Sequence, residues 1–287
     1  MKKIALFMLL GCTLSLQAKP AERIIALAPH IVENLYAIGA GDRIVGTVAY
    51  ADYPQAAKQI PQIGGYHGIQ LEKVLALEPD LVIAWQTGNK KADLEKLEQL
   101  GIQVVYSETK AIEKVADELI KFGQLTGLEA PAREKAQRFT QRLTGLQKQY
   151  AQSSSIKVFY QLWPAPLITV GGNSWVQQVL EICHADNVFA DSTTDYPQIS
   201  IENVLLKSPE VMVIPNEKTE QDIKPIDWHK WPSIPAVKHQ QSISVDADLL
   251  HRYSYRMLEG IADLCGKLDS SRAYYKTMKR VKHDNVE

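Results

Sequence analysis

Two stretches of this 287-residue chain repeat each other, and the repeat narrows the range of folds that the chain can adopt. Residues 71–83 read LEKVLALEPDLVI, and residues 201–213, which lie 130 positions further on, read IENVLLKSPEVMV. Residues 35–45 resemble residues 179–189 in the same way. Because such repeats indicate a repeated structural unit, we predict two similar lobes. The alternative is two unrelated helix–turn–strand units that share a common pattern.

Each half of the chain alternates short apolar segments with segments of helical periodicity. We expect strands at 23–27, 44–48, 81–85 and 104–106 in the first half, and at 158–162, 211–214 and 242–245 in the second. We expect helices at 31–38, 71–77, 93–100 and 176–182. Strands that alternate with helices are typical of α/β folds with parallel sheets. The predicted fold class is therefore α/β, with two similar Rossmann-like lobes.

A longer helical pattern separates the two lobes. Its apolar residues are spaced alternately by 4 and 3 positions, and they are Ala132, Ala136, Phe139, Leu143, Leu146 and Tyr150. This spacing places them in one stripe along a single helix of ~20 residues, which is ~30 Å long. We predict an N-terminal lobe at 19–125, this connecting helix at 126–155 and a C-terminal lobe at 156–287. A single long rigid helix between the lobes restricts their closure to small motions.

The first residues have the layout of a secretory signal. A positive start at Lys2 and Lys3 precedes an apolar run at 4–10, and a small residue, Ala18, offers a cleavage point. This order is typical of export signals, so we predict a signal peptide at 1–18 and an exported chain. The apolar run is shorter than the ~20 residues that a membrane span requires. The alternative is a buried N-terminal helix.

The chain has three cysteines, and the position of the first decides how the other two are interpreted. The segment LLGC, which ends at Cys12, resembles a lipoprotein signal, so a lipid anchor at Cys12 is the alternative to cleavage after Ala18. Cleavage after Ala18 leaves Cys183 and Cys265 as an even pair in an oxidising compartment. We predict a disulfide between them, with two buried free thiols as the alternative.

Composition and motifs favour a binding protein over an enzyme. The chain has 32 Lys and Arg residues and 33 Asp and Glu residues, and this balance argues against a nucleic-acid binder. It has no glycine-rich phosphate loop, no Gly-x-Ser-x-Gly elbow, and no metal-ligand spacing among its seven histidines. We therefore expect no catalytic residue, no bound metal and no resident cofactor. The alternative from another class is an exported metal-dependent hydrolase whose metal site forms only in the folded chain.

Aromatic side chains follow the ends of several predicted strands or lie in the loops beyond them. They are Tyr50, Tyr66, Trp85, Trp163 and Tyr196. Ligands of open α/β sheets bind at the carboxyl edge of the strands, which is where these side chains are expected. Clefts between domains are preferred ligand sites, and aromatic rings stack on flat apolar surfaces. We therefore predict a flat apolar ligand between the lobes, with ordinary loop packing as the alternative.

A polar segment follows the predicted strand at 242–245 and lies at the same edge. Its residues are Asp248, Leu249, Leu250, His251 and Arg252. Asp248 and Arg252 carry opposite charges, and charge-assisted hydrogen bonds from such groups can orient the amides or phosphate of a ligand. We predict that this segment contacts the ligand from the second lobe. The alternative is a surface pair or a helix-capping pair.

Four segments carry a family resemblance, and they lie at 50–54, 71–74, 79–85 and 197–202. They resemble the helical-backbone class of periplasmic binding proteins, which serve ABC importers and carry cobalamin, haem or iron siderophores. The resemblance covers nearly all of the predicted mature chain and is greatest for the cobalamin branch. The segment YADYP at 50–54, the strand end at Trp85, the cysteine pair and the Asp-x-x-x-Arg spacing are the features more specific to that branch.

The resemblance assigns roles to the aromatic residues. It implies that Tyr50, Tyr66, Trp85 and Tyr196 line the corrin site, and that residues 248–252 contact the ligand from the second lobe. Tyr66 and Tyr196 stand where better-known members have tryptophan, and tyrosine keeps an aromatic face for stacking. The segment that contains Trp163 departs from the family's phenylalanine-bearing loop, and we assign Trp163 to the site as well.

The resemblance also implies a function for the repeated segments at 71–83 and 201–213. Glu72 and Glu202 occupy matching positions, and in the family such a pair docks onto arginines of the two-fold membrane permease, which requires a duplicated contact. The chain is thus expected to be a periplasmic carrier, a monomer when free, that captures cobalamin or a related corrinoid. It would deliver this ligand to an inner-membrane ABC permease dimer with its ATPase subunits. The alternative is a haem or siderophore carrier, in which Tyr50 or Tyr66 would ligate iron.

Overall fold

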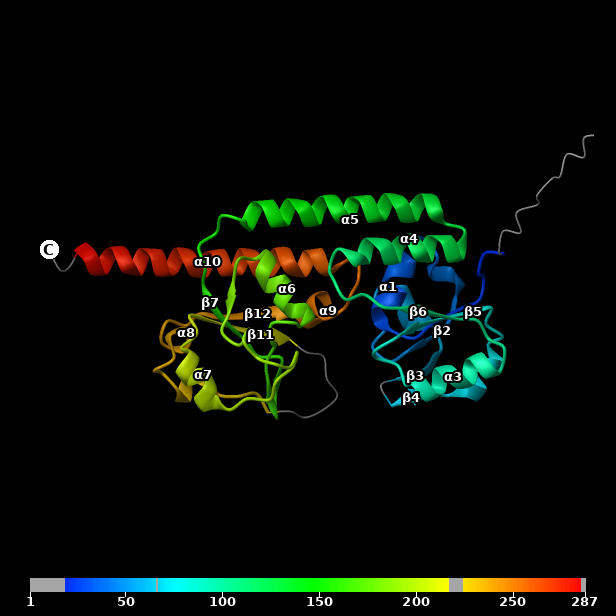
Figure 1. Ribbon diagram of the computed structural model, residues 1–287, viewed down its shortest axis with the longest axis horizontal. Coiled ribbons are helices and arrows are strands. Elements are labelled where there is room, and N and C mark those ends of the chain that lie inside the picture. The colour runs from blue at the N-terminus through cyan, green and yellow to red at the C-terminus, as the bar shows by residue number, and fades with distance from the viewer. Residues whose placement is uncertain (1–18, 66, 217–223, 285–287) are drawn as a thin grey trace, which may run out of the picture.

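The computed structural model describes residues 19–65, 67–216 and 224–284, with side chains up to residue 281. The predicted signal peptide at 1–18, which contains Cys12 and Ala18, and the predicted site residue Tyr66 lie outside the described residues. Figure 1 shows two lobes side by side, with one long helix, α5, lying across both. None of the helices in the described ranges is long and apolar enough to span a membrane.

The N lobe is built on a six-stranded sheet with the order β4-β3-β2-β1-β5-β6. Neighbouring strands are parallel except for β3 and β4, which form an antiparallel hairpin. The strands are β1 (Ile24–Ala26), β2 (Ile44–Val48), β3 (Gln62–Gly65), β4 (Gly68–Ile69), β5 (Leu81–Trp85) and β6 (Val104–Ser107). The helices are α1 (Pro29–Ala37), α2 (Leu71–Ala76), α3 (Lys91–Gln99) and α4 (Lys114–Thr126), with 3-10 turns η1 (Gly41–Arg43) and η2 (Gln55–Gln59).

The C lobe is built on a four-stranded parallel sheet with the order β10-β7-β11-β12, beside a separate hairpin, β8–β9. The strands are β7 (Lys157–Tyr160), β8 (Trp163–Pro164), β9 (Leu167–Ile168), β10 (Asp186–Asn187), β11 (Val211–Asn216) and β12 (Ser242–Asp246). The helices are α6 (Trp175–Ile182), α7 (Ile201–Lys207), α8 (Pro235–Lys238), α9 (Ala247–Leu250) and α10 (Met257–Asp284), with a 3-10 turn η3 (Trp228–Lys230).

The two sheets share one arrangement of four strands. Among the strands common to both lobes, the second, first, third and fourth in chain order are neighbours, as β2-β1-β5-β6 and as β10-β7-β11-β12. The repeated sequence segments form equivalent units, α2 with β5 in the N lobe and α7 with β11 in the C lobe. The prediction of an α/β fold with two similar lobes is therefore confirmed.

Most element bounds follow the apolar pattern of the sequence. β2 and β5 have the predicted bounds, because strands of a parallel sheet that are covered on both faces are apolar throughout. β7 ends at Tyr160 instead of Leu162, because the chain turns there into the β8–β9 hairpin. α1 begins at Pro29, two residues earlier than expected, because the fixed φ of proline suits the first turn of a helix.

The long helix between the lobes is α5 (Glu129–Tyr150), which confirms the single helix predicted from the apolar stripe but is shorter at both ends than the predicted 126–155. It begins later because α4 runs to Thr126. All six residues of that stripe are buried. α5 packs on α4 of the N lobe and on α10 of the C lobe, the two helices beneath it in Figure 1. One hydrophobic cluster runs through residues of β1, α1, α4, α5, α6 and α10. The connector and both lobes therefore share a continuous core.

Cys183 and Cys265 form the predicted disulfide. Cys183 caps the C-terminus of α6, Cys265 lies in α10, and both are fully buried. The bond joins positions that are 82 residues apart in the sequence. Because a crosslink reduces the freedom of the unfolded chain, this bond stabilises the C lobe.

Candidate functional site

A cavity of about 1560 Å³ lies between the two lobes. Its N-lobe wall is formed by the start of α1, the loop after β2, the β3–β4 hairpin and α2 with the residue before it. Its C-lobe wall is formed by the β8–β9 hairpin, the loop that carries Tyr196, and α9 with the two residues that follow it. Several of these segments follow the carboxyl ends of parallel strands, the edge at which open α/β sheets bind ligands.

The structure brings six of the predicted site residues together on the cavity wall. They are Tyr50, Trp163, Tyr196, Asp248, His251 and Arg252. Tyr50 comes from the N lobe and the other five come from the C lobe. The remaining described residues of the predicted set, Trp85, Leu249 and Leu250, do not line the cavity.

Tyr50 presents its ring to the cavity from an unusual backbone conformation. It lies two residues beyond the end of β2 and has a φ of 65°, in the left-handed region that residues other than glycine rarely adopt. Its side chain is 51% exposed, so the ring is accessible to a ligand. The carbonyl oxygen of Tyr50 accepts a hydrogen bond from Arg252 Nη2 at 3.0 Å, which holds this conformation from the opposite lobe.

The C-lobe wall combines aromatic rings with a fixed imidazole. Trp163 lies in β8, where it pairs with Ile168 of β9. Burial, and then the neighbouring Tyr196, raise the pKa of Tyr253 well above its usual range. His251 is oriented by Tyr160, whose buried hydroxyl lies 2.8 Å from His251 Nε2.

Trp85 packs where the two lobes meet instead of on the cavity wall. Its ring centroid lies 5.5 Å from that of His30 and 6.0 Å from that of Tyr253, which in turn lies 4.1 Å from that of Trp175. Burial, and then the nearby Arg252 charge, lower the pKa of His30 to about 3, so this imidazole is neutral at neutral pH. These rings from both lobes form an aromatic cluster, and the ligand contact of Trp85 stays a prediction.

Leu250 packs inside the protein, and the half-buried Leu249 packs against α10. Leu250 is fully buried in the core, and its carbonyl oxygen accepts a hydrogen bond from Trp175 Nε1 at 3.1 Å. Leu249 lies close against Gly260 of α10, where an added Cβ would approach Leu249 Cβ to 2.7 Å. One face of α9 therefore anchors the helix, and the opposite face carries Asp248 to the cavity.

A charged cluster joins the lobes at the base of the cavity. Arg252 donates hydrogen bonds to Glu33 at 2.8 Å and to Asp52 at 3.0 Å, both in the N lobe, and it forms an ion pair with Asp248 at 2.7 Å. Burial opposes the charge of Arg252, but its hydrogen bond to Glu33 and the charge of Asp248 raise the pKa of its guanidinium. Arg256 donates two further hydrogen bonds to Glu33, at 2.9 and 3.0 Å.

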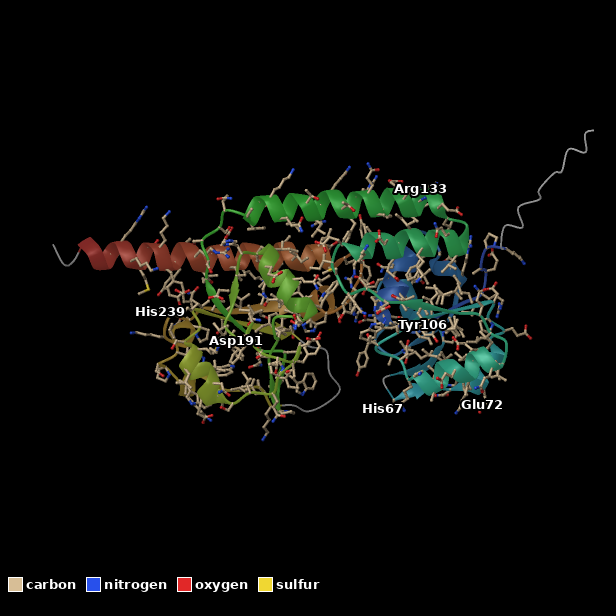
Figure 2. All side chains as sticks on the ribbon, viewed as in Figure 1. His67, Glu72, Tyr106, Arg133, Asp191 and His239 are labelled. Carbon is tan, nitrogen blue, oxygen red and sulfur yellow. A yellow bond between two sulfur atoms is a disulfide. The ribbon has the colours of Figure 1, made fainter. Side chains whose placement is uncertain are left out.

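Several cavity residues were not identified from the sequence. The polar ones are Gln62, His67, Gln70 and Lys73, all from the β3–β4 hairpin and the start of α2. Figure 2 shows His67 on the part of the N lobe that faces the C lobe.

The sequence analysis also did not identify Glu33 and Asp52, which bind Arg252. A hint of each is present in the sequence, because Glu33 is a charged residue within a largely apolar helical segment and Asp52 lies inside the YADYP segment. Their common partner, Arg252, is about 200 residues away and could not be inferred.

Glu72 and Glu202 occupy equivalent exposed positions, each as the second residue of its helix. Figures 1 and 2 show α7 and Glu72 on the face of the molecule opposite α5, one on each lobe. The Ser200 hydroxyl, which caps α7, lowers the pKa of Glu202. Both carboxylates can therefore reach a partner that contacts the two lobes at once.

Among the described residues, no group of three or more histidine, cysteine, aspartate and glutamate side chains could hold a metal ion. The cavity wall instead offers aromatic rings, amide groups and the charged side chains of Lys73, Asp248 and Arg252. This set of groups is suited to stacking and hydrogen bonding.

Comparison with known proteins shows similarity over nearly the whole chain. A family model described as "Periplasmic binding protein" matches residues 24–249. The vitamin B12-binding protein of Vibrio parahaemolyticus is 36% identical over 272 residues, which cover 94% of this chain and 98% of that protein. The vitamin B12-binding protein of Vibrio vulnificus is 38% identical over 266 residues, which cover 92% of this chain and 96% of that protein.

Solved structures show the same architecture. The periplasmic vitamin B12-binding protein BtuF of Vibrio cholerae matches with a TM-score of 0.80 and 37% identity, covering 88% of this chain and 98% of that chain. The periplasmic heme-binding protein RhuT of Roseiflexus matches with a TM-score of 0.79 at 21% identity, covering 88% of this chain and 99% of that chain. The similarity to RhuT shows a shared fold, whereas the similarity to BtuF extends to the amino-acid sequence.

Proposed function

The chain belongs to the periplasmic binding protein family, and from that premise we propose that it captures cobalamin, or a related corrinoid, between its two lobes. The ligand is then delivered to an ABC importer of the inner membrane. The observation that carries this proposal is the large inter-lobe cavity with aromatic walls, in a chain whose relatives at 36–38% identity are vitamin B12-binding proteins. The periplasm is accordingly the proposed location.

The size of the cavity supports a large ligand. Pockets for drug-sized molecules have volumes of roughly 300–1,000 Å³. The inter-lobe cavity, at about 1560 Å³, exceeds this range. A corrin ring with its side chains and nucleotide loop is much larger than a drug-sized molecule, and it needs a cavity that both lobes help to form.

The chemistry of the walls supports the same class of ligand. A corrin ring has two broad apolar faces, against which Tyr50, Trp163 and Tyr196 can stack from both sides of the cavity. Its rim carries amide side chains, which both donate and accept hydrogen bonds. Gln62 and Asp248 are among the cavity residues that can pair with these amides. In this proposal the protein binds and releases its ligand without making or breaking a covalent bond.

The duplicated carboxylates support the proposed delivery step. Glu72 and Glu202 project from equivalent helices on the two lobes. A permease dimer with two-fold symmetry presents the same surface twice, so a matched pair of carboxylates can bind matched basic pockets. The proposed partner is therefore an inner-membrane permease dimer with its ATPase subunits, contacted by a monomeric carrier.

Titration of the purified mature chain with cyanocobalamin tests the ligand, with calorimetry as the readout. We expect binding at micromolar or lower concentration. Haem is the second titrant, because a haem carrier of the same fold would report binding by a Soret band. Haem binding without cyanocobalamin binding at micromolar concentration would overturn the assignment. Metal analysis of the purified protein tests the alternative of a metal-dependent hydrolase, for which a stoichiometric metal would be required.

A further inference from the structure

We propose that Glu33 and Arg256, which do not line the cavity, are positioning residues for ligand binding because they hold Arg252 against the backbone of Tyr50. The inference rests on the proposed function, because it concerns the same inter-lobe site. We call Glu33, Arg252 and Arg256 the cross-lobe clamp. Its role is to keep the ring of Tyr50 on the cavity wall by contacts that come from the opposite lobe.

Glu33 is the centre of the clamp. It lies in α1, and its side chain is 1% exposed. Its Oε1 accepts hydrogen bonds from Arg252 Nη1 at 2.8 Å and from Arg256 Nη2 at 2.9 Å, and its Oε2 accepts one from Arg256 Nε at 3.0 Å. A buried carboxylate with three charge-assisted hydrogen bonds fixes both guanidinium groups in position.

Arg252 connects this centre to the loop after β2. Besides its bond to Glu33, its Nη1 donates to Asp52 Oδ1 at 3.0 Å, and its Nη2 donates to the carbonyl oxygen of Tyr50 at 3.0 Å. The loop is thus held by one guanidinium at both a side chain and the backbone. Because Tyr50 has a φ of 65°, where a side chain is unfavourable, its conformation depends on contacts of this kind.

Arg256 holds the same loop from a second direction. Its guanidinium carbon lies 3.4 Å from the centre of the Tyr53 ring, a stacked cation–π contact. Arg256 therefore connects Glu33, which lies outside the loop, to Tyr53, which lies within it. Together the two arginines restrain the loop at Tyr50, Asp52 and Tyr53. Asp248 also pairs with Arg252, at 2.7 Å, but Glu33 is the carboxylate that binds both arginines.

Neutralising Glu33 is expected to release Tyr50. The variant Glu33→Gln leaves two largely buried guanidinium groups close together without their shared counter-charge, so they repel each other. Arg252 then withdraws from the Tyr50 carbonyl, and Tyr50 can relax from the left-handed region. A ligand that stacks on its ring must restore the lost order on binding, which lowers its affinity.

The matched control is Glu118→Gln. Glu118 is also a buried carboxylate of an N-lobe helix, α4, but its ion-pair partner is its neighbour Lys121 at 3.8 Å and it does not line the cavity. We expect Glu33→Gln to weaken cyanocobalamin binding by about tenfold or more and Glu118→Gln to change it by less than about twofold. Thermal unfolding of both variants shows that they remain folded at the temperature of the titration.

A second substitution tests whether Glu33 acts through Tyr50. In a Tyr50→Ala background the ring is already absent, so Glu33→Gln is expected to cost little further affinity. If Glu33→Gln prevents folding, Arg256→Lys replaces it, because a lysine cannot make both hydrogen bonds to Glu33 and stack on Tyr53. Wild-type affinity in both clamp variants, or a penalty that persists in full beside Tyr50→Ala, would overturn the inference.

Hydrogen exchange of the ligand-free protein provides a readout that does not depend on the identity of the ligand. We expect faster exchange of the amides at residues 50–53 in Glu33→Gln than in wild type, and no such change in Glu118→Gln. Unchanged exchange in this loop contradicts the clamp. If wild type fails to bind cyanocobalamin but the loop is released in Glu33→Gln, the proposed ligand is wrong and the positioning role stands.

Discussion

The two lobes contain the same four-stranded parallel sheet, yet they present different surfaces to the cavity between them. The N lobe extends its sheet by the β3–β4 hairpin, in which a Cβ at Gly64 would collide with the carbonyl oxygen of Gly68, so the two strands approach closely there. The C lobe has the β8–β9 hairpin with Trp163 and the α9 segment with Arg252. The sheets are alike, and the connections at their carboxyl edges differ.

The proposed function makes two different demands on the lobes, and the shared and the divergent parts of the lobes meet one demand each. A two-fold permease needs the same contact twice, and Glu72 and Glu202 occupy equivalent positions on the two lobes. A corrinoid has unlike faces and edges, so its two walls need to differ. The shared sheet order thus serves the proposed partner, and the divergent loops serve the proposed ligand.

The largest expected effect follows from breaking the symmetric part of the comparison. In the double variant Glu72→Lys and Glu202→Lys, both docking carboxylates are reversed, so we expect corrinoid uptake through the importer to be abolished. Cobalamin affinity should be unchanged, because neither residue lines the cavity. Uptake by a reconstituted importer and calorimetry measure the two properties separately.

The control for this variant is Glu134→Lys, an exposed carboxylate on α5, at the opposite face of the molecule. We expect it to leave uptake unchanged. If the two single reversals differ strongly, the contacts are not equivalent and the symmetric interpretation is wrong. Loss of cobalamin binding in the double variant would contradict the docking role.

Removing the disulfide tests whether the two lobes unfold independently, because the bond lies wholly in the C lobe. Replacing Cys183 and Cys265 by serine should lower the free energy of unfolding by about 2–5 kcal/mol, since the closed loop is long. Urea unfolding measures this loss. Because one core cluster runs through both lobes and α5, we expect a single unfolding transition in wild type and variant. Separate unfolding of the C lobe would show that the lobes are energetically independent.

His30 tests the aromatic cluster where the lobes meet. Burial lowers its pKa from 6.5 to about 3, so the unfolded chain binds a proton between these pH values and the folded chain does not. Stability from this group is therefore complete above pH 6.5 and is lost as the pH falls toward 3. By pH 5 the loss is about 2 kcal/mol.

Urea unfolding at pH 7 and pH 5, in wild type and in His30→Gln, measures this contribution. The glutamine variant is expected to be less stable at pH 7, because it disturbs the packing against Trp85 and Tyr253. Its stability should nevertheless fall less between pH 7 and pH 5 than that of wild type. An equal fall in both proteins would show that His30 does not titrate in this way.

The smallest expected effects compare the two cavity walls. Tyr50→Ala and Trp163→Ala each remove one stacking surface, one from each lobe, and each should weaken cobalamin binding by about 1–2 kcal/mol. Trp85→Ala should mainly lower the unfolding temperature, since its ring packs in the inter-lobe cluster. Calorimetry and thermal unfolding distinguish the two outcomes. An affinity loss from Trp85→Ala as large as that from Tyr50→Ala would restore Trp85 to the ligand site.

Much of the fold could be predicted because burial leaves a local pattern. β2 and β5 were located by their apolar runs, and α5 by one stripe whose residues are all buried. The β8–β9 hairpin was missed, because its strands have two residues each and carry no periodicity. Short connections of this kind depend on what they pack against.

The predicted site was only partly reproduced, and the reason is geometric. Position at the end of a strand indicates which edge of the sheet a side chain lies at. It does not indicate whether the other lobe covers that side chain. Tyr50 remains exposed beyond β2, whereas Trp85, at the end of β5, is half-buried and its ring packs against Tyr253 of the other lobe. Leu250 is buried because α9 packs on α10.

The sequence by itself determined the duplicated α/β lobes, the helix between them, the cysteine pair and the matched positions of Glu72 and Glu202. Each of these follows from periodicity, from the number of cysteines or from a repeat, all of which are visible in the sequence without the fold. Only the tertiary structure decided that Arg252 joins Glu33 and Tyr50, and that Trp85 packs against Tyr253 of the other lobe. Such contacts join side chains 168 to 219 positions apart, and they exist only once the shared core has set the two lobes against each other.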